Sequence, residues 1–171
     1  MSRPKSVPDD HVLTAIAAIY RMGGDKAVTF ASVAAATGLA PPTLVQRYRS
    51  RDGMLDWALQ GAWAALEKAT AEALPLLSDK GSAAFLKALA GSVAQSFPMA
   101  ALISETRRDG LTDRAALWRE TVETHLARAM GNPRLHRDAA RIAFAAWQGQ
   151  VLWETAGGKG FRLKDALRRI V

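Results

Sequence analysis

Residues 29–54 read TFASVAAATGLAPPTLVQRYRSRDGM, and this stretch decides the fold. It predicts two short helices separated by a tight turn. Thr29 is expected to cap the first helix, residues 30–36, because its hydroxyl can accept a hydrogen bond from a free backbone N–H at the helix start. Gly38 is expected to end that helix, since glycine adopts the left-handed backbone conformation that other residues resist.

The second helix is expected to begin at the Ala-Pro-Pro-Thr run of residues 40–43. Proline is tolerated in a first helical turn because the N–H groups there have no intrahelical partner. Two such helices form a helix-turn-helix when small or apolar residues lie where they touch. The residues expected on this packing face are Val33, Ala34, Leu39, Leu44 and Tyr48.

The other side chains of this segment are expected to point outward, where they could contact a DNA duplex. The candidates are Thr29, Pro41, Pro42, Thr43, Val45, Gln46, Arg47, Arg49 and Arg51. Gln46 can pair with an adenine edge, and Arg47 with guanine or a phosphate. The threonine hydroxyls can reach phosphates, and the last two arginines lie beside a helix start that also favours a phosphate. The alternative interpretation is an ordinary helical hairpin with solvated arginines, because this spacing also arises by chance in alanine-rich chains.

The sequence around this segment predicts further helices and no strand. A first amphipathic helix, expected to stop at residues 23–24, is indicated by apolar residues at helical spacing: Leu13, Ile16, Ala17 and Tyr20. Ser50 is expected to cap a fourth helix of about five turns that ends near residues 74–75. Further helices are expected at residues 82–97, 99–108, 112–130, 134–155 and 161–171. The Gly-Gly-Lys-Gly run at 157–160 is expected to be a hinge, because a phosphate-binding loop would need a preceding strand.

Composition limits the class of protein. The chain has 171 residues, of which 49% are hydrophobic, so it can bury a core. It has no cysteine, which excludes disulfides and thiolate-bound metal and fits a reducing compartment. No apolar run reaches about 18 residues and no signal peptide is evident, so we expect a cytoplasmic protein with no membrane partner. The net charge of +7 suggests an anionic partner such as nucleic acid, although residues 1–52 hold seven basic against four acidic residues, or only +3.

Residues 12–59 resemble the DNA-binding domain of the TetR family of bacterial transcriptional regulators. The family pattern G-V-S-x-G-T-L-Y-x-H-F-x-S-K-E-x-L corresponds to GLAPPTLVQRYRSRDGM at residues 38–54. The resemblance implies an all-α protein with a DNA-binding domain at 1–53, joined by a long fourth helix to a ligand-binding and dimerisation domain at 54–171. It implies a homodimeric repressor of a palindromic operator, released by a small apolar ligand. By position, Thr43 and Arg51 would contact phosphates, while Gln46 and Arg47 would face the groove.

Two positions depart from the family pattern. Val45 replaces a tyrosine whose hydroxyl meets a phosphate, and Pro42 replaces a glycine that lets the backbone approach DNA. These departures motivate a second hypothesis. In it, the chain is a regulator-like helical protein that binds a lipid or another small molecule and has weak or lost DNA binding.

The rest of the chain supplies candidates for a ligand cavity and for a dimer interface. The cavity candidates are large apolar side chains with a few polar groups: Trp63, Leu66, Phe85, Leu89, Phe97, Leu102, Glu105, Trp118, Thr121 and His125. The interface candidates form one stripe of the last long helix: Ala140, Ala143, Phe144, Trp147 and Val151. Each set has a plainer interpretation, because aromatic residues at helical spacing also build ordinary cores and the stripe could close the subunit's own core.

Nothing in the sequence indicates catalysis, and we expect no enzyme, cofactor or metal. The three histidines, His11, His125 and His136, are scattered, and none has the i, i+4 partner typical of a helical zinc site. The chain lacks the glycine-rich and nucleophile motifs that hold phosphates, dinucleotides or a reactive serine.

Overall fold

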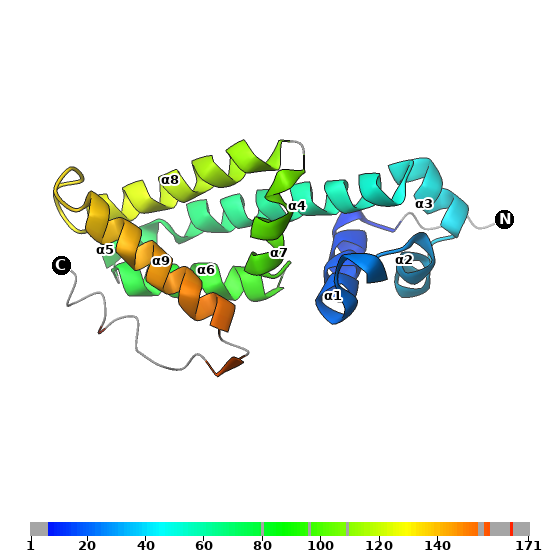
Figure 1. Cartoon of the computed structure of the whole chain (residues 1–171), viewed down its shortest axis with the longest axis horizontal. Helices are drawn as coiled ribbons and strands as arrows, with labels where there is room; N and C mark the ends of the chain where they lie inside the picture. The colour runs from blue at the N-terminus through cyan, green and yellow to red at the C-terminus, as the bar shows by residue number, and fades with distance from the viewer. Residues whose placement is uncertain are drawn as a thin grey trace. The chain divides into compact units, whose positions relative to one another are not determined.

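The structure is a computed structural model that describes residues 7–79, 81–95, 97–108, 110–153, 156–157 and 165. In these ranges the secondary structure is helical with no strand, which confirms the all-α prediction (Figure 1). No helix among these residues is long and apolar enough to cross a membrane. The chain divides into two compact units: unit 1 is residues 1–64 with 96–98, and unit 2 is residues 65–95 with 99–171. These units are defined by compactness and not by function, so the predicted functional domains at 1–53 and 54–171 stay a prediction.

Unit 1 contains α1 (Asp9–Ala27), α2 (Phe30–Thr37), α3 (Pro41–Tyr48) and the first part of α4 (Arg51–Ala73). The predicted stop of α1 at residues 23–24 is only partly right. Gly24 leaves the helical conformation, with φ 66° and ψ −165°, but a kinked helix continues to Ala27. Gly24 therefore breaks the regular helix at the predicted position, and a short helical segment follows as far as Ala27.

The core of unit 1 is built where α1, α2 and α3 pack with the start of α4. Its fully buried side chains include Val12, Ile16, Val28, Val33, Leu44, Met54, Leu55 and Leu59. Gly61 lets α4 approach α1 closely, because a Cβ at this position would lie 3.1 Å from the Cδ2 of Leu13. The apolar face predicted for α1 is confirmed at Ile16 and Ala17, which are 0% and 2% exposed.

Unit 2 contains the end of α4, then α5 (Pro75–Asp79), α6 (Ser82–Gln95), α7 (Met99–Ser104), the 3₁₀ turn η1 (Glu105–Arg107), α8 (Leu111–Ala129) and α9 (Arg137–Trp153). The sequence predicted every one of these except α5, which follows α4 after a single turn residue. The helix expected at 99–108 tightens into a 3₁₀ turn after Ser104. The helix expected at 161–171 and the hinge expected at 157–160 lie almost wholly outside the described residues.

An aromatic cluster on α8 and α9 forms the centre of unit 2. The ring centroids of Trp118 lie 5.7 Å from those of Phe144 and 6.4 Å from those of Trp147. Two polar contacts fix α8 on α4. The indole Nε1 of Trp118 donates to Oγ1 of Thr70 at 2.9 Å, and Arg114 makes a two-pronged contact with Glu67 at 2.7 Å for each pair of atoms.

We predict that Thr70→Val destabilises unit 2, because valine has the shape of threonine but removes the acceptor for the buried indole N–H. The expected loss is about 1–3 kcal/mol in the free energy of unfolding, measured by urea titration. Thr70→Ser keeps the hydroxyl and serves as the matched control. An unchanged unfolding midpoint in the valine variant would show that this hydrogen bond contributes nothing.

Candidate nucleic-acid interface

Helix α2 is fixed at both ends by backbone and side-chain contacts. Oγ1 of Thr29 accepts a hydrogen bond from the N–H of Ser32 at 3.0 Å, and Oγ of Ser32 accepts one from the N–H of Thr29 at 3.0 Å. Gly38 ends the helix with φ 73°. Both predicted caps are thus confirmed. The Thr29 hydroxyl already accepts a hydrogen bond in the cap. It could bind a phosphate, as predicted, only while it also keeps that hydrogen bond.

Helix α3 is anchored on one side and exposed on the other. Leu44 is fully buried and Tyr48 is 7% exposed, as the sequence predicted. The other predicted DNA-contacting residues of this helix are all exposed: Pro41, Pro42, Thr43, Val45, Gln46 and Arg47. A hollow of about 310 Å³ lies on this face and is lined by Val7, Leu39, Thr43, Gln46 and Arg47. The face therefore combines hydrogen-bonding groups with apolar surface, which are the two means of reading base edges in a major groove.

Arg47 does not stand free in this structure. Its Nη2 lies 2.7 Å from Oδ1 of Asp9 at the start of α1, and its guanidinium lies 5.8 Å from the ring centroid of Tyr48. The side chains of Arg47 and Asp9 are 35% and 63% exposed. An ion pair this exposed to water is weak, so another anion can displace Asp9. Sequence reasoning did not find this partner, because α1 and α3 are distant in the chain.

Arg51 joins the start of α4 to the end of α1. Its Nε donates to the carbonyl oxygen of Val28 at 2.9 Å, and its Nη2 lies 2.7 Å from Oδ1 of Asp25 and also donates to the carbonyl oxygen of Asp25. Its Nη1 donates to Oδ1 of Asp52 at 3.2 Å. Four of the five N–H donors of the guanidinium are therefore engaged within unit 1. Its predicted phosphate contact stays a prediction, whereas its role in holding unit 1 together is a finding.

Arg49 lies in a strained turn between α3 and α4. Its φ is 68° and its ψ is −49°, and the N–H of Ser50 donates to the carbonyl oxygen of Tyr48 at 2.8 Å, which closes a three-residue turn. Such γ-turns are rare and unfavourable for a residue with a side chain. Gly53 makes room for the turn, because a Cβ there would lie 2.5 Å from the Tyr48 oxygen. Oγ of Ser50 accepts from the N–H of Gly53 at 2.9 Å, which confirms the predicted cap of α4.

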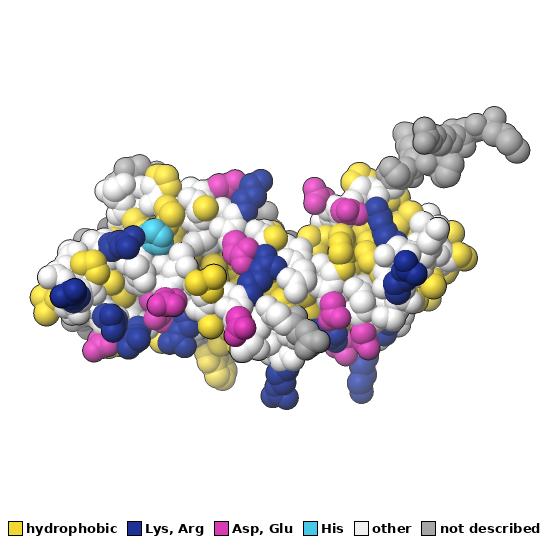
Figure 2. All heavy atoms as spheres, turned by 90° about the horizontal axis from the view of Figure 1, so that it is seen from above, with side chains coloured by type: hydrophobic (Ala, Val, Ile, Leu, Met, Phe, Trp, Pro, Cys, Tyr) yellow, Lys and Arg dark blue, Asp and Glu magenta, His cyan; other side chains and the backbone are white. Residues whose placement is uncertain are grey.

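Basic side chains do not gather into a single patch on the surface that Figure 2 shows. On the face seen in Figure 2, Lys and Arg side chains are interspersed with Asp and Glu over the surface. Arg49 is an exception locally: it is exposed, and among the described residues no carboxylate forms an ion pair with it. Beside α3, Arg49 therefore offers a positive charge to a phosphate.

The predicted ligand-cavity residues fall into two groups. The apolar ones are buried, at 0–5% exposure: Trp63, Leu66, Phe85, Leu89, Phe97, Leu102 and Trp118. Trp63 and Phe97 belong to unit 1, and the others belong to unit 2. Among the polar ones, Glu105 pairs with Arg108 at 2.9 Å, and Thr121 and His125 line a hollow of about 410 Å³ on α8. Partial burial, helped by Arg128, lowers the pKa of His125, which favours the neutral imidazole. Their role in ligand binding stays a prediction.

The residues predicted for the dimer interface lie mostly inside unit 2. Ala140, Ala143, Phe144 and Trp147 are 0–1% exposed and belong to the core of unit 2, and Val151 is half-buried. Side chains buried in this way offer little surface to a second chain, and their role in a dimer stays a prediction. The plainer interpretation of this stripe, closure of the subunit's own core, is the one that the structure supports. The large apolar side chains that α9 exposes are Ile142, Leu152 and Trp153.

No protein-family model matches this chain, and no curated protein matches it significantly. The fold is similar to that of a crystal structure described as a candidate transcriptional regulator from Rhodococcus sp. RHA1. The two share 22% sequence identity with a TM-score of 0.55, and the match covers 94% of this chain and 92% of the other. At this identity the likeness establishes a shared fold over nearly the whole length of both chains.

We predict that Arg49→Gly stabilises the protein by about 1 kcal/mol, because glycine adopts positive φ without the penalty that a Cβ brings. Arg49→Ala is the matched control, since it removes the same charge but keeps the Cβ. Urea unfolding followed by circular dichroism measures both. Equal stability of the two variants would show that the turn carries no strain.

Proposed function

We propose that this protein is a DNA-binding transcriptional regulator that reads a duplex with α3 and works as a two-fold dimer. One observation carries the proposal: α3 is anchored by Leu44 and Tyr48, while Thr43, Gln46 and Arg47 line one outward hollow. A short helix held in this way presents its free side chains to the edges of bases in a major groove. The resemblance of residues 12–59 to the TetR family and the shared fold support the same function.

The contacts proposed for α3 divide into base reading and phosphate binding. Gln46 would pair with an adenine edge, and Arg47 would leave Asp9 to pair with guanine or a phosphate. The exposed Arg49 would bind a phosphate beside the start of α4, where free backbone N–H groups also favour an anion. Arg51 would contribute chiefly by keeping α1 and α4 in place.

The dimer is proposed to form through the exposed side of α9. Ile142, Ala145, Gly149 and Leu152 follow one another at three- or four-residue intervals on the side away from the buried stripe. Trp153 extends this apolar seam at the helix end with 64% exposure. Small residues within such a seam let two helices approach closely. A regulator with one reading helix per chain needs a second copy to bind two half-sites about one helical turn apart.

Regulation by a small apolar ligand follows from the family resemblance and is proposed here for unit 2. Helix α4 supplies Leu59 and Trp63 to the core of unit 1, and Leu66 and Thr70 to that of unit 2. A ligand that altered the packing of unit 2 would therefore act on a helix that also belongs to unit 1. Release from the operator requires that the ligand prefer the non-binding state. The proposal includes no catalysis.

The second candidate function is a small-molecule or lipid carrier that no longer reads DNA. It is favoured by Val45, which is 45% exposed and presents an apolar side chain where the family places a phosphate-binding tyrosine hydroxyl. A carrier would bind duplexes weakly and without regard to sequence.

We predict that the protein enriches a palindromic sequence from a pool of random duplexes, and that Gln46→Ala weakens binding to that sequence by about tenfold or more. Fluorescence anisotropy at two salt concentrations measures the affinity. The control is Gln60→Ala, an exposed glutamine of α4 outside the proposed contacts. Failure to enrich any sequence, together with micromolar binding of all duplexes alike, would favour the carrier.

We predict that Ile142→Glu shifts the protein from dimer to monomer, because it places a charge in the proposed apolar seam. Sedimentation velocity over a range of protein concentrations measures the change. Leu135→Glu is the matched control, since Leu135 is 77% exposed and lies outside the seam. A wild-type chain that stays monomeric at micromolar concentrations would contradict the proposed dimer.

A further inference from the structure

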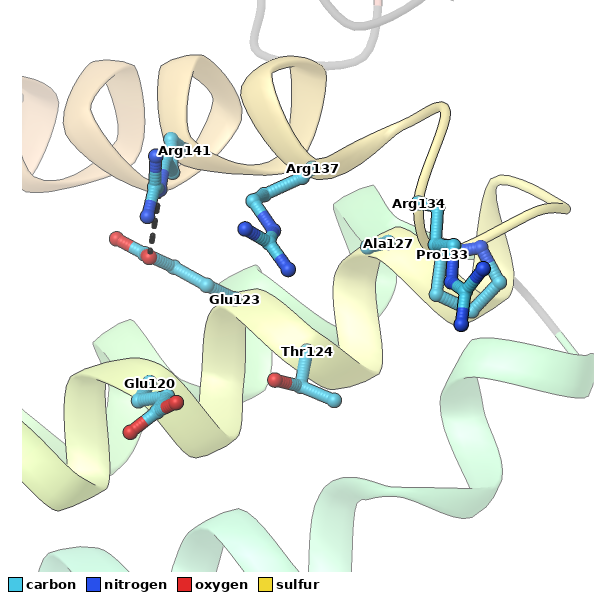
Figure 3. A pocket seen from close by; sticks show the side chains of 8 residues that line it. All are labelled: Glu120, Glu123, Thr124, Ala127, Pro133, Arg134, Arg137 and Arg141. Atoms are coloured by element: carbon cyan, nitrogen blue, oxygen red, sulfur yellow. Dashed lines mark ion pairs between the residues drawn. The ribbon is translucent and has the colours of Figure 1, made fainter.

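A hollow of about 250 Å³ lies where the end of α8, the start of α9 and the loop between them meet (Figure 3). Its charged and polar lining comes from both helices and the loop: Glu120, Glu123, Thr124, Arg134, Arg137 and Arg141. None of these residues belongs to the DNA-reading face, to the predicted ligand cavity or to the predicted dimer stripe. The hollow is thus a feature of unit 2 that the proposed function does not use.

One carboxylate in the lining is already neutralised. Glu123 is only 13% exposed, and its Oε1 lies 2.7 Å from Nε of Arg119. Its Oε2 lies 3.6 Å from Nε of Arg141, the contact marked in Figure 3. Arg141 is further paired with Asp138 at 3.5 Å. These four groups balance one another in charge, so they neither attract nor repel an incoming anion strongly.

The other two arginines are not balanced in this way. Figure 3 shows Arg137 extending from α9 toward α8, and Arg134 projecting from the loop beside Pro133. Among the described residues, no carboxylate forms an ion pair with either guanidinium. Arg137 is also the first residue of a 17-residue helix, whose free backbone N–H groups add positive potential at the same place.

We infer that this hollow binds a small anion through Arg134 and Arg137, with a carboxylate or a phosphate group as the bound chemistry. A guanidinium offers a planar pair of donors that matches two oxygens of either group. The Thr124 hydroxyl lines the same hollow and offers one further donor. The volume corresponds to about eight water molecules, which suits a phosphate or a small polycarboxylate.

The carboxylate of Glu120 limits what can enter the hollow. The lining holds three arginines against two glutamates, and Glu120 has no role in balancing the paired group. A long polyanion such as a nucleic acid would bring phosphates against that carboxylate. A compact anion brings fewer charges near Glu120, while Arg134 and Arg137 both line the hollow that would hold it. The inference does not depend on DNA binding and stands or fails separately from it.

Isothermal titration calorimetry of the full chain in Tris-chloride buffer tests the site, with inorganic phosphate and citrate as separate probes at matched ionic strength. We expect saturable binding at one site per chain, and the tighter of the two probes identifies the preferred group. Arg137→Gln and Arg134→Gln should each weaken binding by about tenfold, whereas Arg137→Lys should give an intermediate loss because it keeps the charge but not the fork.

The control is Arg107→Gln, an exposed arginine of η1 outside the hollow, which should bind as the wild type does. Circular dichroism of each variant checks that the helices remain, and the exposure of both arginines makes their substitution compatible with folding. Two results would overturn the inference: no saturable binding of either probe by the wild type, or equal affinities in the wild type and both glutamine variants.

Discussion

In unit 1, Arg51 links the start of α4 to the end of α1 through several contacts at once. A single guanidinium binds the carbonyl oxygen of Val28, both the backbone and the carboxylate of Asp25, and the neighbouring Asp52. It thereby fixes the first turn of α4 against the segment that leads into α2. Helix α3 lies between α2 and α4 in the chain and is anchored by its own buried side chains, Leu44 and Tyr48. Arg51 complements this anchor by fixing the helix that follows α3.

Local signals in the sequence were sufficient for most of the fold. Thr29, Gly38 and Ser50 each act within four residues of their own position, and all three cap the helices they were predicted to cap. The burial of Leu44 and Tyr48 likewise follows from helical spacing alone. Gly24 likewise breaks the regular helix of α1 where the sequence predicted its stop, although a short helical segment continues to Ala27.

Two features could not be predicted from the sequence: the ion pairs between residues distant in the chain, and which of the two apolar sides of α9 faces the core. Asp9 and Asp25 look like ordinary helix-end carboxylates, and nothing in their spacing indicates that arginines of α3 and α4 would bind them. Helix α9 is apolar on two sides, so its periodicity could not tell which side faces the core. The structure places Phe144 and Trp147 inside and leaves Ile142 and Trp153 outside. That no carboxylate of the described residues forms an ion pair with Arg134 or Arg137 could not be read from the linear pattern either.

The pairing of Arg47 with Asp9 bears on the thermodynamics of the proposed DNA complex. Until it contacts a phosphate, the guanidinium of Arg47 is already neutralised by the carboxylate of Asp9. When Arg47 binds a phosphate, condensed cations leave the duplex, but the carboxylate of Asp9 loses its partner and attracts cations in turn. The net number of cations released is therefore smaller than the number of basic side chains near α3 would suggest. Affinity should thus depend on ionic strength more gently than the composition of this face implies, and recognition would rest correspondingly more on shape and base contacts.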